Sequence, residues 1–152
     1  MLARLPLLAV VLASCASAPP EGARSVIVAE RRNWCGPNWK ASFTPDQVLQ
    51  RIQNNCMSAH TDTRRFRPTE SQWAAVSAAL SSSQFAELPP EITTVTNADG
   101  TITLRTDDPV SCIEASGHRV CGTTYALEHT PEGERFRRVW SALCAIAPEP
   151  EL

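Results

Sequence analysis

The chain has 152 residues, with 14 basic and 16 acidic side chains that leave a formal net charge of -2. These charges are spread along the sequence, so it lacks the basic footprint of a nucleic-acid-binding protein and the polybasic patch of a membrane-surface protein. The length suffices for one hydrophobic core but not comfortably for two, so a single domain is expected.

Residues 1–14 have the layout of a secretory signal, with a positively charged start and an apolar run over 5–13. Spanning a bilayer takes about 20 apolar residues, so this shorter run indicates a cleaved leader. Ordinary signal peptidase accepts small residues such as those at 16–18, but Pro19 follows them directly. Because proline restricts the extended backbone that a scissile segment needs, cleavage there is disfavoured.

The run ends in Leu12-Ala13-Ser14-Cys15, which resembles the lipobox of bacterial lipoproteins. The resemblance implies that the Cys15 thiol receives a diacylglyceryl group, that cleavage falls just before Cys15, and that the new amine is acylated. Two or three acyl chains anchor a protein durably, whereas one holds it only marginally. Aspartate after the lipidated cysteine would resemble an inner-membrane retention signal, and Ala16 stands there instead. We therefore expect an outer-membrane anchor with the domain facing the periplasm; the alternative is an ordinary secreted protein.

Residues 15–24 are interpreted as a lipidated linker, because they contain two prolines and a glycine and no large apolar side chain. The folded domain is expected over residues 25–147. The proline-containing segment 148–152 is expected to be a frayed tail.

The domain is predicted to open with a hairpin. Residues 25–29 form a run suited to a strand, and Trp39, Ala41 and Phe43 alternate with polar residues as a half-buried strand does. The segment 35–38, Cys-Gly-Pro-Asn, has the composition of a turn between them.

The next segment supports two interpretations. Thr44-Pro45-Asp46-Gln47 is a good capping box with proline at the first helical position. A helix would then place Val48, Leu49, Ile52 and Cys56 on one face. The same residues also permit a turn at 45–46 and a strand over 47–53, and the local pattern favours the helix only narrowly.

Residues 57–67 are polar and are interpreted mainly as a loop. A second capping box at 69–72 then predicts a helix. Its inward side chains would be Trp73, Val76, Ala79 and Leu80.

From residue 91 the hydrophobic period changes to two. Strands are predicted at 92–96 and 101–105 around the loop 97–100, and a second pair at 111–115 and 119–127 around 116–118. Thr130-Pro131 then caps a closing helix, whose apolar side chains recur at helical spacing: Phe136, Val139, Trp140, Leu143 and Ile146. The predicted class is α+β, with an antiparallel sheet packed against two helices in one small disulfide-bonded domain.

The sequence has 6 cysteines, and all but the lipobox cysteine lie in the predicted domain. Export to an oxidising compartment makes disulfides the default. Cys112 and Cys121 flank the second predicted hairpin where they can face each other, and a Cys35–Cys56 bridge would close the amino-terminal unit. Cys144 is then unpaired and is interpreted as a small buried hydrophobe; a bond to another chain is the alternative.

A zinc site is an alternative use of the same region. Cys112, His118, Cys121 and His129 are zinc-ligand types, but they lack the paired Cys-x-x-Cys spacing of a structural site. A disulfide would also consume both thiolates. We therefore expect no metal and no cofactor, with His118 an exposed turn residue.

Catalytic patterns are equally weak. The sequence contains no Gly-x-Ser-x-Gly elbow, no Gly-x-x-x-x-Gly-Lys phosphate loop and no His-Glu-x-x-His. His60 and Asp62 are an acid–base pair only in principle, since side chains in a polar loop more often face solvent. Among the tryptophans, Trp34 and Trp39 flank the cysteine turn and are the pair whose surface exposure is in question.

A looser resemblance concerns the domain itself. Its motif order resembles small uncharacterised domains of bacterial secreted proteins and lipoproteins, in which a helix precedes a strand hairpin and a second helix closes the sheet. Such domains often begin with a strand hairpin, which favours the strand for 47–53. The residues that carry the resemblance are Thr69-Glu70-Ser71-Gln72-Trp73, Phe85, Leu88, Asp99-Gly100, Gly117, Pro131, Phe136 and Leu143.

The expected function is that of a membrane-anchored binding or structural accessory module of an envelope assembly, with a protein partner and no nucleic acid. One alternative is a periplasmic inhibitor of a hydrolase, a lysozyme or a protease, acting through a loop held by the Cys112–Cys121 bridge. The other is an enzyme that uses His60, Asp62 or the Cys144 thiol.

Overall fold

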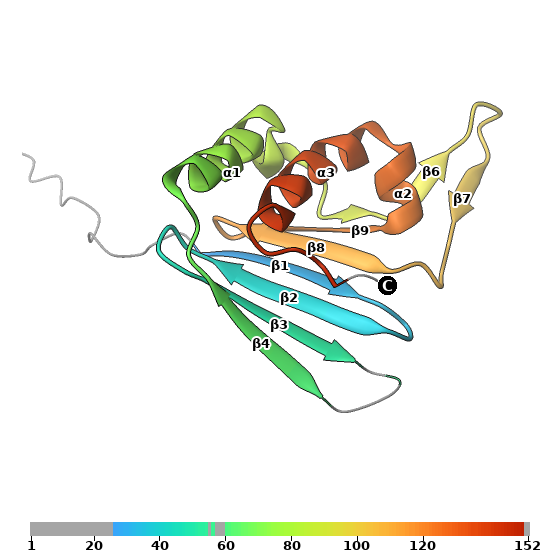
Figure 1. Ribbon diagram of the computed structural model, residues 1–152. Helices are drawn as coiled ribbons and strands as arrows, with labels where there is room; N and C mark the ends of the chain where they lie inside the picture. The colour runs from blue at the N-terminus through green and yellow to red at the C-terminus, as the bar shows by residue number, and fades with distance from the viewer. Residues whose placement is uncertain (1–25, 55, 57–59, 151–152) are drawn as a thin grey trace, which may run out of the picture.

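The computed structural model describes residues 26–54, 56 and 60–150. The signal peptide, the lipobox and the linker predicted at 1–24 lie outside the described residues. Within them, three α-helices lie on one side of a large β-sheet (Figure 1).

The sheet has seven strands in the order β4-β3-β2-β1-β8-β9-β5. All neighbours are antiparallel except β5 and β9, which run parallel. The strands are β1 Ile27–Arg32, β2 Pro37–Phe43, β3 Val48–Asn54, β4 Thr61–Phe66, β5 Glu91–Ile92, β8 Val110–Ala115 and β9 His118–Thr123.

The remaining elements complete the two layers. A small hairpin, β6 and β7, projects from the body beside α2 (Figure 1). The elements are α1 Glu70–Ser82, a 3-10 turn at Phe85–Glu87, β6 Thr94–Thr96, β7 Ile102–Leu104, α2 Thr124–His129 and α3 Pro131–Cys144.

This architecture confirms the α+β class and differs from the expectation in two details. The sheet is mixed because β5 joins it in parallel to β9. A short third helix, α2, also replaces the end of the strand predicted over 119–127. The cause is local, because the Thr123 side chain accepts a hydrogen bond from Ala126 N and so caps a helix start.

The helix predicted narrowly for 47–53 is wrong, and the alternative strand is present as β3. Thr44 and Gln47 close a tight turn instead of capping a helix: Thr44 N donates to Gln47 O at 2.9 Å, and Gln47 N donates to Thr44 Oγ1 at 3.1 Å. The same side-chain cap that starts a helix therefore closes a hairpin here. Seven antiparallel residue pairs between β2 and β3 form the rest of this hairpin.

The predicted loop at 57–67 likewise contains a strand, β4, at the edge of the sheet. Its side chains are mostly exposed, because no further described strand pairs with it and the helices lie over the other strands (Figure 1). A strand with little to bury shows no alternation of apolar and polar residues, so its sequence resembles a loop.

The core lies between the sheet and the helices. The capping box predicted at Thr69 and Gln72 is present, and Val76 of α1 is fully buried. The apolar residues predicted to face inward from both helices all belong to the core cluster or pack against it. Trp39 is buried there and its ring centroid lies 5.3 Å from that of Trp140.

The tail predicted to fray is held in place over residues 148–150. Gln50 Nε2 donates to Pro148 O at 2.6 Å, and Glu149 accepts hydrogen bonds from Arg31 and Trp140. Composition indicated fraying because the segment has little to bury. The contacts that hold it are polar, and those from Arg31 and Gln50 come from strands far away in sequence.

Candidate functional site

The strands expose one face that no helix of the described chain covers, here called the helix-free face. Cross-strand register places one row of side chains on it, running from β4 through β3, β2, β1 and β8 to β9. The row contains Thr63, Arg51, Lys40, Glu30, Cys112 and Cys121. Alternation puts their chain neighbours Ala29, Ala41 and Ile113 in the core on the other side.

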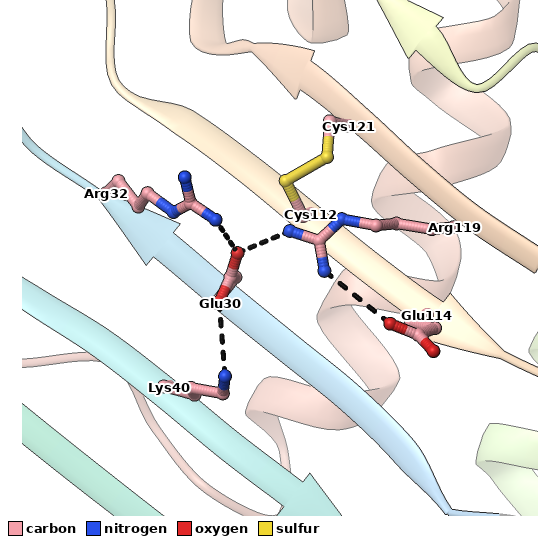
Figure 2. Close-up of a disulfide and its surroundings, with 7 residues drawn as sticks. All are labelled: Glu30, Arg32, Lys40, Cys112, Glu114, Arg119 and Cys121. Atoms are coloured by element: carbon pink, nitrogen blue, oxygen red, sulfur yellow. Dashed lines mark hydrogen bonds and ion pairs between the residues drawn. A yellow bond between two sulfur atoms is a disulfide. The ribbon is translucent and has the colours of Figure 1, made fainter.

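Glu30 is the centre of a charge cluster on this face, although only 8% of its surface is exposed. Its carboxylate accepts from Arg32 Nη2 and Arg119 Nη2 at 2.5 Å each, and Lys40 Nζ lies 3.5 Å away. Figure 2 shows these three cations converging on Glu30 from both sides, beside the Cys112–Cys121 bridge. Burial raises the pKa of Glu30, but hydrogen bonds from Arg119 and Arg32 and their charges outweigh it, so the pKa lies below its ordinary value.

A groove of about 370 Å³ opens beside this cluster, lined by Glu30, Arg31, Arg32, Asn38, Trp39, Lys40, Arg51, Gln53 and Thr61. Arg31 is engaged elsewhere, because its guanidinium binds Glu149 and Thr124. Arg32 and Lys40 share the single carboxylate, and Arg51 forms no ion pair within the described part of the chain. Positive charge therefore exceeds negative charge in the groove, although the whole chain carries -2.

Replacing Glu30 with glutamine tests this cluster. The variant leaves Arg32, Lys40 and Arg119 gathered around a neutral amide, so we expect a loss of about 1–3 kcal/mol in the free energy of unfolding near neutral pH. The folded pKa of Glu30 is lowered, so its contribution is present above the unfolded pKa and is lost as the pH falls through the folded pKa. The difference in stability between the two proteins should thus shrink as the pH falls below the ordinary glutamate pKa and disappear below the lowered pKa of folded Glu30. Denaturant unfolding at several pH values measures this, and a gap that persists at low pH contradicts it.

On the opposite side of the sheet, Cys144 lies in a second polar cluster. Its thiol donates to Glu149 Oε1 at 3.6 Å, and the same oxygen accepts from Trp140 Nε1 at 2.6 Å. Burial, and then the neighbouring Glu149 charge, raise the pKa of Cys144 to about 12. Because the thiolate is the reactive form, a thiol in this setting is a poor nucleophile.

Cys144 should accordingly resist thiol reagents in the folded protein. In a Cys15→Ser chain at about pH 8, we expect no modification until the protein is unfolded, and then one modified thiol per chain. Mass spectrometry of samples treated with iodoacetamide before and after unfolding measures the difference. Complete modification of the folded chain within minutes would show that the thiol is accessible and ionised.

We compared the chain with protein-family models and with curated proteins. Neither comparison found a match. The chemistry of the site is therefore the basis for assigning a function. Among the described residues, no helix is both long enough and apolar enough to cross a membrane.

Both predicted disulfides are present. Cys35 is bonded to Cys56, and Cys112 is bonded to Cys121 across β8 and β9. The second bond consumes the two thiolates that a zinc site would have used. His118 differs from the expected exposed turn residue, because it belongs to β9 and its Nε2 lies 3.0 Å from Leu88 O. Cys15, the residue predicted to carry the lipid, is outside the described residues.

The structure does not bring the other candidate residues into a catalytic arrangement with one another. Asp62 pairs with Arg64 at 2.8 Å, and His60 is exposed before β4. The two tryptophans beside the cysteine turn have opposite environments: Trp34 is 90% exposed and Trp39 is 1% exposed. Trp34 lies in the connection between β1 and β2, both of which contribute residues to the groove.

Sequence reasoning missed the groove residues, although one signal was available. Lys40 is the only lysine in the chain, and every other basic side chain is an arginine. Its position on the polar side of an alternating strand is visible from the sequence. Its proximity to Glu30 and Arg51 depends on the register between three strands, and one of those strands was expected to be a helix.

Proposed function

We propose that this protein is an envelope lipoprotein, anchored through Cys15 to the bacterial outer membrane and facing the periplasm. In this proposal it acts as a binding or structural accessory module, and the helix-free face is its working surface. The lipobox supports the anchor, and the linker that follows it would let the domain reach a partner away from the bilayer.

The observation that carries the binding role is the basic groove on the helix-free face. A solvated sheet face ordinarily mixes opposite charges. Here three cations contact the Glu30 carboxylate, only Arg119 of them has a second acid, Glu114 at 3.6 Å, and Arg51 adds an uncompensated charge. Charge that is concentrated in a groove attracts and orients an oppositely charged partner. This accounts for a polar, partly buried cluster that core packing does not require.

Affinity capture from crosslinked envelopes tests the proposal. We expect the native chain to recover a protein in proportion to the bait, and the Cys15→Ser chain, which lacks the proposed anchor, to recover much less. Metabolic labelling with palmitate should mark the native chain alone. If the native chain recovers no protein in proportion to the bait, the binding role is wrong. If the Cys15→Ser chain is still labelled with palmitate, the anchor at Cys15 is wrong.

The projecting hairpin favours one second candidate, an inhibitor of a periplasmic hydrolase. Ile102 and Leu104 of β7 are 69% and 58% exposed, and they share the outer side of the hairpin with Thr94 and Thr96. Exposed apolar side chains on a protruding element suit insertion into a cleft. Assays against lysozyme and proteases at about micromolar concentration decide this candidate, and an absence of inhibition removes it.

A further inference from the structure

We infer that the groove on the helix-free face binds an acidic, extended segment of a partner protein, whose carboxylates are held by Arg51, Lys40 and Arg32. The inference rests on the proposed binding function and names the chemistry of the partner. The groove is the one lined by Glu30, Lys40, Arg51 and their neighbours on β1, β2, β3 and β4.

The cations favour a carboxylate ligand. A guanidinium presents paired N–H donors that match the two oxygens of a carboxylate, and Arg51 offers them with no competing acid in the described chain. Arg32 and Lys40 are already oriented by Glu30, with side chains 65% and 58% exposed. A ligand carboxylate can therefore reach both without displacing Glu30.

The neutral residues favour a peptide over a simple anion. The Gln53 side chain has no hydrogen bond with a described residue, and register places it in one row with Thr61 and Asn38. Asn38 Oδ1 accepts from Asn33 N at 2.8 Å, which leaves its amide NH2 as a donor. Side-chain amides and hydroxyls can donate to and accept from peptide groups. A chain that runs along the groove would thus present its backbone to Gln53 and Asn38 and its carboxylates to Arg51 and Lys40. Arg32, which follows Arg31 at the end of β1, would bind a further carboxylate at the end of the groove.

The same features argue against a membrane surface as the occupant. Proteins that lie on bilayers combine basic residues with a broad apolar face that enters the acyl region. The binding surface here is concave, and the Glu30 side chain between the cations is only 10% exposed. A flat headgroup layer would meet its rim, whereas a peptide can enter it.

The test uses the purified Cys15→Ser chain and a fluorescent oligoglutamate peptide, with oligoglutamine and phosphatidylglycerol vesicles as comparison probes. We expect saturable binding of oligoglutamate alone, weakened by added salt. Arg51→Glu should weaken binding by about tenfold or more. Arg138→Glu, the same change at an exposed arginine on α3, is the matched control and should have little effect.

Lys40 allows a second, positional readout because it is the only lysine. The peptide carboxylates are activated before the protein is added, so that Glu30, which lies 3.5 Å from Lys40 Nζ, is not activated as well. An activated carboxylate should then form an amide with the Lys40 amine, and mass spectrometry should find that amide at Lys40. Lys40→Arg keeps the charge but removes the amine, so it should bind the peptide and form no such amide.

The outcomes separate the inference from the function on which it rests. Absence of oligoglutamate binding, equal loss in Arg51→Glu and Arg138→Glu, or binding of the vesicles alone would each overturn the acidic-segment assignment. If envelope capture nevertheless recovers a partner, the binding function stands with a ligand of other chemistry. If capture also fails, both are wrong.

Discussion

Trp39→Ala is expected to destabilise the fold by about 3–5 kcal/mol, the range for deleting a large buried aromatic side chain. Trp39 is 1% exposed, and its ring centroid lies 5.3 Å from that of Trp140 and 6.4 Å from that of Phe43. The truncation leaves a cavity between the sheet and α3 that these rings cannot fill without shifting.

Trp34→Ala is the matched control for this prediction. It removes the same side chain from the other side of the Cys35 turn, where 90% of the residue is exposed. We expect a change within about 0.5 kcal/mol. Chemical denaturation of both variants gives the comparison. Equal losses in the two variants would place Trp39 outside the core.

Gly133→Ala should be comparably damaging, with a loss of about 3 kcal/mol or more, because it forces backbone atoms apart. A Cβ at Gly133 would lie 2.5 Å from Leu127 Cα and still closer to Leu127 O. The contact arises because α2 and α3 are joined by Thr130 alone, whose hydroxyl accepts from Gly133 N at 3.0 Å. The two helices must separate to admit even one methyl group.

The neighbouring Glu132→Ala provides the control for Gly133→Ala. Glu132 is half-buried in the same first turn of α3, and its replacement by alanine shortens the side chain, so it tests helix propensity and charge without a clash. We expect less than about 0.5 kcal/mol. Thermal unfolding followed by circular dichroism measures both. An alanine at 133 that leaves the melting temperature unchanged would mean that α2 and α3 are not so closely apposed.

Local chemistry predicted the elements whose signals are complete within a few residues. The capping box at Thr69 and Gln72 and the apolar stripe of α3 need no distant partner, so both helices were predictable. The Cys112–Cys121 bond was predictable because a short hairpin brings the two cysteines opposite each other. Such features depend on backbone geometry that the sequence determines locally.

The incorrect or missing predictions concern features that depend on pairing between separate elements. Thr44 and Gln47 satisfy the same hydrogen bonds in a helix cap and in a hairpin turn, so only pairing with β2 distinguishes them. The tail residue Glu149 is held by Arg31 and Trp140, which no local pattern connects to it. The groove was not predictable for the same reason. Glu30, Lys40 and Arg51 lie on three strands, and only the register between those strands brings them side by side.

The central claim, that the helix-free face is the surface through which this protein binds a partner, is tested most directly by site-specific photocrosslinking in cells. A photoreactive side chain replaces Thr63, which is exposed in the row that contains Arg51 and Lys40. Matched positions are Ala78 on the outer side of α1 and Ile102 on the projecting hairpin. We expect a discrete protein adduct from position 63 and none from position 78. Adducts from position 78 or 102 with none from position 63 would contradict the account.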